Sequence, residues 1–231
     1  FTMSKALSDR VKKIPSSGIR AFFDLVLQSK GIISLGVGEP DFFTPWNIRE
    51  EAIYRLEQGA TTYTSNLGLL ELRQEIAVYL EQKFSLQYSD SQILITNGVS
   101  EGVDIVCRSF LNPGDEVILP EPAYVCYRPL IELSGGKVVS IDTSSSQFVP
   151  LAVQIEAAIT NKTKMIMLSY PNNPTGQSIP FSELSKIAAL AVKHNLLILT
   201  DEIYAALSFT PFKSIAEIAS VKPNIIYLNG F

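Results

Sequence analysis

Short apolar runs alternate with segments of helical spacing over the second half of the chain. The apolar runs have the length and the β-branched content of buried strands, and turn residues bound them. They occupy residues 92–96, 116–119, 137–141, 164–169, 196–200 and 224–228. Between them, apolar residues recur every three or four positions, as in Val99, Val103, Val106 and Phe110, and in Leu184, Ile187, Ala188 and Ala191. Strands separated by helices predict an α/β fold with a doubly wound, mostly parallel sheet that helices cover on both faces.

The first 90 residues follow a different pattern, in which helical spacing dominates. Two helical arm segments, at residues 8–13 and 17–29, and two amphipathic helices, at residues 48–58 and 69–84, are predicted there. The loop at residues 61–68 is polar and rich in hydroxyl groups. A long polar loop between helices is often functional, and we expect this one to carry part of a site.

Composition excludes several classes of protein. The 231 residues are 46% hydrophobic and 18% charged, below the roughly 25% charged that is typical of soluble domains, so the chain can bury a full core. A net charge of −4 argues against a nucleic-acid partner, and no apolar run reaches the ~18 residues of a membrane span. Cys107 and Cys126 match no metal spacing, so we expect no metal site and two buried thiols in a reducing cytoplasm.

Candidate chemistry follows the predicted strands, because ligands of open α/β sheets bind at the carboxyl ends of the strands. After residues 92–96, the glycine turn Asn97-Gly98-Val99-Ser100 leads into a helix. The free N–H groups at such a helix start suit a phosphate. The alternative is a plain turn in which Ser100 caps the helix.

Two further strand ends carry constrained or charged residues. After residues 164–169, two prolines and a glycine fix the backbone of a loop that presents Asn172 and Asn173. After residues 196–200, Asp201 places a carboxylate at a buried strand end, which is costly without a cationic partner. The structural alternatives are a helix cap for Asp201 and core packing for Tyr204.

Taken together and in order, these stretches resemble the fold-type-I pyridoxal-phosphate (PLP) aminotransferases of class I/II, the group that includes aspartate and aromatic aminotransferases. The resemblance runs from residue 34 to the last residue, and over this range the chain is similar to the N-terminal part of such an enzyme. The matching stretches are Ser34-Leu35-Gly36-Val37-Gly38-Glu39-Pro40-Asp41-Phe42, Tyr63-Thr64 with Gly68, Glu71-Leu72-Arg73, Thr96-Asn97-Gly98, Pro122-Ala123-Tyr124, Asn172-Asn173-Pro174-Thr175-Gly176, Asp201-Glu202-Ile203-Tyr204 and Asn229-Gly230-Phe231.

The resemblance implies a role for each site residue toward PLP. Asp201 would pair with the pyridine nitrogen, and Tyr204 would donate a hydrogen bond to the phenolic oxygen. Asn173 would contact the same oxygen and the substrate carboxylate, and Tyr124 would stack on the ring. The backbone amides of Val99 and Ser100, with the Ser100 hydroxyl, would bind the phosphate.

Two further roles concern the substrate and a second subunit. Gly38 would let the backbone approach the substrate carboxylate, and Tyr63 would reach the cofactor phosphate of the neighbouring subunit, which implies a homodimer. The implied organisation is an N-terminal arm with a substrate-side loop over residues 1–45 and an incomplete PLP-binding large domain over residues 46–231.

The implied reaction is transfer of an amino group between an amino acid and a 2-oxo acid, although the residues do not indicate which ones. A carbon–sulfur β-lyase, or other chemistry at the α-carbon, is the alternative on the same fold. A non-catalytic PLP-binding module is a third possibility. A dinucleotide-binding domain is disfavoured, because no Gly-x-Gly-x-x-Gly follows the first strand of the sheet.

The family's Schiff-base lysine follows Asn-Gly-Phe by two positions, and the sequence ends at Phe231. Lys213 is interpreted as a surface lysine rather than a substitute. We therefore expect these 231 residues to be the first part of a longer enzyme and to be inactive alone. The resemblance also predicts a cis peptide bond at Asn173–Pro174, and a second one at Glu121–Pro122.

Overall fold

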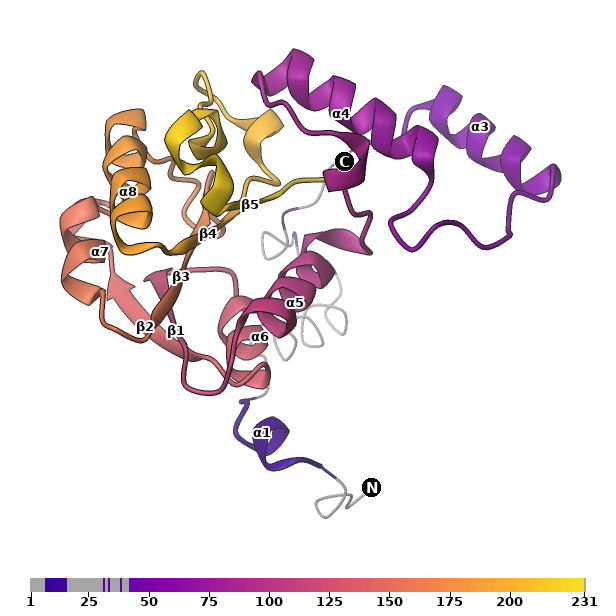
Figure 1. Ribbon diagram of the computed structural model, residues 1–231. Helices are drawn as coiled ribbons and strands as arrows, with labels where there is room; N and C mark the ends of the chain where they lie inside the picture. Colours follow the sequence, from indigo (N-terminus) through magenta and orange to yellow (C-terminus); the bar gives the residue numbers. More distant parts are fainter. Residues whose placement is uncertain (1–6, 16–30, 32, 34–37, 39–41, 231) are drawn as a thin grey trace. The chain divides into compact units, whose positions relative to one another are not determined.

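The computed structural model describes residues 7–15, 31, 33, 38 and 42–230 (Figure 1). The chain divides into two compact units, one formed by residues 14–66 and the other by residues 1–13 and 67–231. The helix predicted at residues 17–29 lies outside the described residues. The predicted division between residues 45 and 46 stays a prediction.

Five parallel strands form the sheet of the larger unit, in the order β2-β1-β3-β4-β5. They are β1 (Glu116–Glu121), β2 (Lys137–Asp142), β3 (Thr163–Ser169), β4 (Leu197–Asp201) and β5 (Ile225–Leu228). Each lies within two residues of a predicted strand, so the predicted α/β fold with a parallel sheet is confirmed. The chain steps outward from β1 to β2 and then returns to β3 on the other side of β1. This reversal creates a switch point between β1 and β3, which is the usual ligand position in such sheets.

Helices cover both faces of this sheet (Figure 1). On one face, α5 (Gly98–Phe110) and α6 (Tyr127–Leu133) pack in one apolar cluster with strand residues such as Val117. On the other face, α7 (Ala152–Ala158) and α8 (Phe181–His194) pack with residues such as Ile118. Successive strand side chains point to opposite faces, which explains why neighbouring residues join different clusters.

The predicted apolar faces of α5 and α8 are largely confirmed. Leu184, Ile187, Ala188 and Ala191 of α8 are all buried in one cluster. Val103 and Val106 of α5 are buried, whereas Phe110 in its last turn is 42% exposed. Short 3-10 helices complete the larger unit: η1 (Asp90–Gln92), η2 (Ser144–Ser146), η3 (Ala205–Leu207), η4 (Ile215–Glu217) and η5 (Ala219–Asn224).

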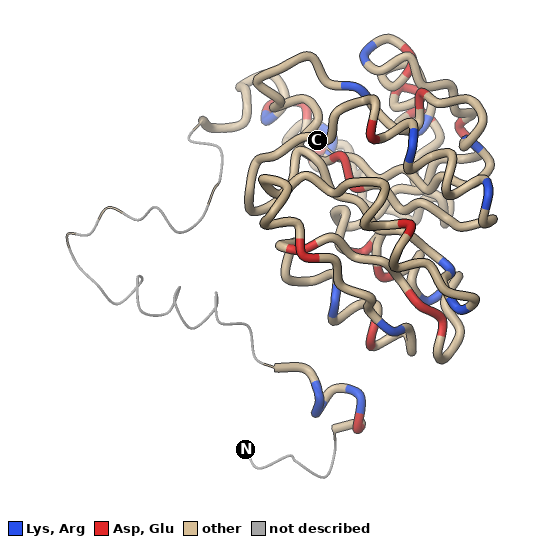
Figure 2. Tube along the Cα trace, turned by 90° about the vertical axis from the view of Figure 1, so that its left-hand side faces the viewer, with Lys and Arg blue, Asp and Glu red and all other residues tan. Residues whose placement is uncertain are grey.

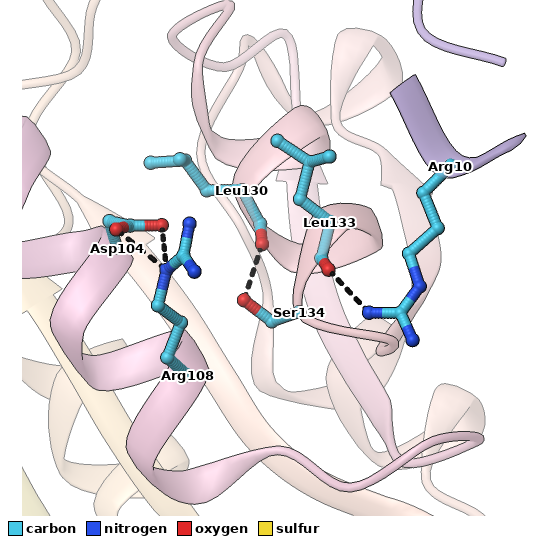
Figure 3. A network of polar contacts seen from close by, with 6 residues as sticks. All are labelled: Arg10, Asp104, Arg108, Leu130, Leu133 and Ser134. Atoms are coloured by element: carbon cyan, nitrogen blue, oxygen red, sulfur yellow. Dashed lines mark hydrogen bonds and ion pairs between the residues drawn. The ribbon is translucent and has the colours of Figure 1, made fainter. Parts of the chain in front are cut away.

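The N-terminal segment attaches to α6. Helix α1 (Asp9–Lys12) is capped by Ser8, whose side chain accepts from the N–H of Val11. The Arg10 guanidinium donates to the carbonyl oxygen of Leu133 at 3.2 Å (Figure 3). This contact satisfies a carbonyl of the last turn of α6, which has no intrahelical partner, and places a positive charge at the helix C-terminus.

Two helices occur at the predicted positions before the sheet. Helix α4 (Leu70–Phe84) belongs to the larger unit and buries Leu80 and Phe84. Helix α3 (Trp46–Glu57) lies in the unit of residues 14–66 and buries none of its side chains. The exposed side chains of α3 include Trp46, over whose ring the Arg49 guanidinium lies at 5.4 Å.

The strand predicted at residues 92–96 is wrong, because no ladder forms there. The segment lies outside every strand of the sheet, and among the described residues its one backbone hydrogen bond to a distant position runs from the Ile95 N–H to the Leu67 carbonyl, at 3.0 Å. Between this segment and β5 lies a hollow of about 550 Å³, lined by side chains such as Ile93 and Ile226. Within the described residues, no strand pairs with the outer edge of β5. A β-rich sequence without a neighbouring strand cannot form a ladder.

Charged residues of both signs are interspersed around the sheet (Figure 2). Many form local pairs, such as Arg108 with Asp104 at 2.8 Å on α5 (Figure 3). Across the described ranges, no helix has the length and apolar character needed to cross a membrane. The same residues contain no group of His, Cys, Asp and Glu side chains that could hold a metal ion.

Candidate functional site

The carboxyl ends of three neighbouring strands, β1, β3 and β4, present predicted site residues along one edge of the sheet. Tyr124 follows β1, Asn173 follows β3, and Asp201 ends β4 with Tyr204 three residues later. Because parallel strands end at the same edge, residues that are far apart in sequence meet there. The switch point between β1 and β3 lies within this row.

Asp201 is buried and accepts two hydrogen bonds. The Tyr127 hydroxyl donates to Oδ2 at 2.6 Å, and the Ile203 N–H donates to Oδ1 at 3.1 Å. Burial raises the pKa of Asp201, and these two hydrogen bonds oppose the rise. Within the described residues, Asp201 forms no ion pair and caps no helix. The site therefore offers a desolvated carboxylate that a cationic ligand group would stabilise.

Tyr127, to which no role was assigned from the sequence, connects Asp201 to Tyr124. Its ring meets the Tyr124 ring edge to face, with centroids 5.6 Å apart and planes at 82°. Burial and the Asp201 charge raise the pKa of Tyr127, so its hydroxyl keeps its proton and acts as a donor. Tyr124 is half-buried, and its ring orientation is fixed by this contact.

The N-terminus of α5 lies beside the end of β5. A Cβ on Gly102 would lie 3.1 Å from Cδ2 of Leu228, so the absence of a side chain permits the close packing. Asn97, not Ser100, is the N-cap residue of α5, which corrects the alternative interpretation of Ser100. Val99 and Ser100 lie in the first turn, where N–H groups have no helical acceptor.

Cis peptide bonds shape the loops after β1 and β3. The predicted cis bonds at Asn173–Pro174 and Glu121–Pro122 are confirmed, and a third, at Tyr170–Pro171, was not predicted. The Asn172 side chain joins the two loops, because its Nδ2 donates to the Pro122 carbonyl at 3.3 Å and its Oδ1 accepts from the Thr175 hydroxyl at 3.0 Å. Asn173 is half-buried, and its side chain makes no hydrogen bond to the described residues, so the amide is available to a ligand.

Tyr204 is the N-cap residue of η3 and is 38% exposed, so the alternative of core packing is wrong. Its hydroxyl makes no hydrogen bond to any described residue. Gly38 and Tyr63 are exposed and belong to the unit of residues 14–66. Their predicted roles toward the sheet stay predictions.

Glu202, the residue after Asp201, is fully buried, and no role is predicted for it from the sequence. Its Oε1 accepts from the hydroxyls of Tyr170, Thr200 and Ser214, at 2.8, 2.9 and 2.9 Å. Its Oε2 has no partner among the described residues. Burial raises the pKa of Glu202 to about 7, against the opposing hydrogen bonds. The sequence feature that could have indicated this buried carboxyl group is its position directly after a buried strand. Successive side chains there point to opposite faces of the sheet, so Glu202 faces away from Asp201.

Lys213 is a surface lysine, as expected. Its Nζ lies 3.0 Å from Oε2 of Glu217, and its side chain is 62% exposed. An ion pair with a solvent-exposed partner of this kind contributes little to stability.

Comparison with known proteins gives a consistent picture. Residues 30–231 match the family model of aminotransferase class I and II. A putative aminotransferase of Bacillus subtilis, YugH, is 48% identical over 99% of this chain, and a probable N-acetyl-LL-diaminopimelate aminotransferase of the same organism is 43% identical over 99%. The crystal structure of Thermus thermophilus aspartate aminotransferase with maleate superposes with a TM-score of 0.91 at 33% identity over 97% of the chain. The chain spans only 60%, 58% and 60% of these three proteins, respectively.

Replacing Glu202 by glutamine should remove a pH-dependent contribution to stability. Burial raises the pKa of Glu202 from 4.5 in the unfolded chain to about 7 in the folded protein. Its contribution to the free energy of unfolding is therefore full below pH 4.5 and is lost as the pH rises through about 7. We expect the free energy of unfolding of the wild type to fall by about 3 kcal/mol relative to that of E202Q over this range. Urea unfolding at several pH values measures the difference.

The control is E116Q. Glu116 is also buried, but its hydrogen bond from Thr160 lowers its pKa, so it stays ionised over the same range. The difference in the free energy of unfolding between wild type and E116Q should therefore not change over this pH range. Parallel curves for wild type and E202Q would contradict the prediction.

Proposed function

The chain belongs to the class I and II aminotransferases, a family that uses PLP, and from this we propose that the protein transfers an amino group between an amino acid and a 2-oxo acid. In this proposal, the edge of the sheet described above holds the cofactor. The observation that carries it is Asp201, a buried carboxylate with two neutral donors and no cationic partner within the described residues.

Asp201 suits the ring nitrogen of PLP because a protonated pyridine supplies the missing positive charge. When bound, the cofactor supplies a conjugated ring that takes up the electrons left on the substrate α-carbon. The part of Asp201 is to keep the ring nitrogen protonated, which requires an ionised and fixed carboxylate. The Tyr127 hydroxyl, at 2.6 Å, provides the fixing contact and favours the ionised form.

Three side chains at the same edge have groups that a ligand could use. The Tyr204 hydroxyl and the Asn173 amide make no hydrogen bonds to the described residues, and we propose that both bind the phenolic oxygen of the cofactor. Asn173 would also contact the substrate carboxylate. The Tyr124 ring, held by Tyr127, would stack on the cofactor ring.

The N-terminus of α5 suits the phosphate of PLP. The N–H groups of Val99 and Ser100 and the Ser100 hydroxyl would donate to the phosphate oxygens, and the helix dipole favours the negative charge. Gly98, at φ +78°, has no atom within 4 Å of an added Cβ, so the turn leaves space for a bulky anion.

The remaining assignments concern a second subunit and the substrate. We propose a homodimer in which Tyr63 reaches the phosphate of the neighbouring subunit, and in which the backbone at Gly38 approaches the substrate carboxylate. Tyr63 is fully exposed, and α3 in the same unit exposes several large apolar side chains, as an interface would require.

We also propose a cytoplasmic location. Both cysteines are free thiols, and the prediction that both are buried holds for Cys107 and not for Cys126, which is half-buried; burial raises the pKa of Cys107 to about 12 and that of Cys126 to about 11. At neutral pH both therefore stay protonated and unreactive, which suits a reducing compartment.

Replacing Asp201 by asparagine should weaken PLP binding by about 10- to 100-fold, because a hydrogen bond to a charged partner contributes ~1.5–3 kcal/mol. Equilibrium dialysis against PLP measures the affinity. The matched control is D104N, which removes a carboxylate from an exposed ion pair with Arg108 on α5 and should leave the affinity unchanged. Equal affinities for D201N and wild type would refute the assignment of Asp201.

The complete protein, supplied with PLP, should move an amino group from an amino acid to a 2-oxo acid. A panel of amino acids with 2-oxoglutarate, analysed by chromatography, would detect the new amino acid. Release of ammonia and pyruvate from cystathionine without an oxo acid would instead show a β-lyase. The 231 residues alone are expected to give no transfer, since the lysine that the family uses is not among them.

The complete protein should have twice the mass of one chain in sedimentation equilibrium. Replacing Tyr63 by alanine should leave the mass unchanged and should weaken PLP binding by about tenfold, because it removes a donor to the phosphate. A monomer at micromolar concentration, or unchanged affinity in Y63A, would contradict the proposed role of the second subunit.

A further inference from the structure

Glu202 connects the ends of several elements that carry the candidate site, although the proposed function gives it no contact with the cofactor. Its Oε1 gathers the hydroxyls of Tyr170, Thr200 and Ser214. Tyr170 directly follows β3, Thr200 belongs to β4, and Ser214 is the N-cap residue of η4. A single buried oxygen atom therefore joins three separate segments of the chain.

Backbone hydrogen bonds extend this network to β5 and secure its members. The Glu202 N–H donates to the Leu228 carbonyl at 2.9 Å, which ties the end of β4 to the end of β5. The Tyr170 hydroxyl accepts from the Ile215 N–H at 2.8 Å, and the Ser214 hydroxyl accepts from the Ala216 N–H at 3.0 Å. Because these two hydroxyls accept backbone N–H groups, their own protons are left to point at Glu202.

The segments that Glu202 joins lead directly to the candidate cofactor residues. Tyr170 is three residues before Asn173, and Glu202 lies between Asp201 and Tyr204. The chain after Leu228 passes close by, since a Cβ on Gly230 would lie 2.7 Å from Cδ1 of Ile203. A displacement of Glu202 would therefore shift the groups proposed to bind the ring nitrogen and the phenolic oxygen.

We propose that Glu202 is a positioning residue of the cofactor site, which fixes the ends of β3 and β4 and the start of η4 relative to one another through the hydroxyls gathered on Oε1, beside the backbone contact that ties β5 to β4. This inference rests on the proposed function, because the residues it positions are those assigned to PLP. In this proposal, the Asp201 carboxyl group faces the ligand on one side of the sheet, and the Glu202 carboxyl group holds the strand ends in place from the opposite side.

The acceptor on Oε1, rather than a negative charge, is the functional feature of Glu202. Its Oε2 has no partner among the described residues. In addition to burial, the charge of Glu217 raises the pKa of Glu202, and the charge of Glu202 raises the pKa values of Tyr88 and Tyr227. None of these provides a positive charge, so a neutral side chain suits the position. Glutamine keeps the acceptor oxygen, whereas methionine has a similar length and lacks it.

The test compares PLP affinity in E202Q and E202M by equilibrium dialysis, with the stability of each variant measured in parallel. We expect E202M to bind PLP at least about tenfold more weakly than the wild type, and E202Q to remain within about threefold of it. The matched control is E116M, because Glu116 is a buried carboxylate at the amino end of β1 that accepts from Thr160 and Lys137. It should lose stability and keep its affinity for PLP.

A second pair of variants decides the question if E202M does not fold. Thr200→Val removes one hydroxyl donor to Glu202, and Thr160→Val removes one donor to Glu116. We expect T200V to weaken PLP binding by about threefold or more and T160V to leave it unchanged. Four outcomes would overturn the proposal. E202M could bind PLP as tightly as the wild type, E116M could lose as much PLP affinity as E202M, E202Q could lose as much as E202M, or T200V and T160V could have equal PLP affinities.

Hydrogen exchange separates this proposal from the proposed function. If the wild type does not bind PLP, the function fails, and the positioning role is judged on the backbone amides of Glu202, Ile215 and Ala216. Exchange at these amides should rise at least about tenfold in E202M, or in T200V if E202M does not fold, beyond the rise that the variant's loss of global stability produces, and it should show no such excess in E202Q and E116M. Exchange without this excess in the variant that folds would overturn the role of Glu202 independently of any ligand.

Discussion

Two consecutive carboxyl groups are buried at the end of β4, and the arrangement of the surrounding chain depends on how they are satisfied. Asp201 and Glu202 point to opposite faces of the sheet, so each needs its own hydrogen-bond donors. A tyrosine serves each of them: Tyr127 from the start of α6 and Tyr170 from the end of β3. Since an unpaired buried carboxylate costs several kcal/mol, α6, β3 and η4 must sit where they can reach these groups.

The regular part of the fold could be predicted from the sequence because its signals are local. Buried parallel strands appear as continuous apolar runs, and α8 shows its buried face through Leu184, Ile187 and Ala191. The strand predicted at residues 92–96 failed because a ladder depends on a neighbour, which no local pattern contains.

From the sequence, only those site residues could be predicted whose local sequence context indicates a chemical role. Asp201 stands out as a carboxylate after a buried strand, and the family pattern supplied the expected partner. Tyr127 was missed because it lies 74 positions from Asp201, and nothing near it in sequence indicates the contact. Glu202 was missed because two of its hydroxyl partners, Tyr170 and Ser214, come from other segments that meet it only in the folded chain. Networks of this kind depend on tertiary structure, and sequence patterns do not contain them.

Within the residues that the structure describes, the outer edge of β5 has no partner strand, and this has a physical consequence. An unpaired strand edge presents a row of N–H and C=O groups, and here it borders a hollow lined by isoleucine and tyrosine side chains. Unpaired backbone groups beside an apolar surface are the features by which a sheet edge pairs with an extended segment. In the described part of the chain, this edge is therefore the place at which a further extended segment would continue the sheet.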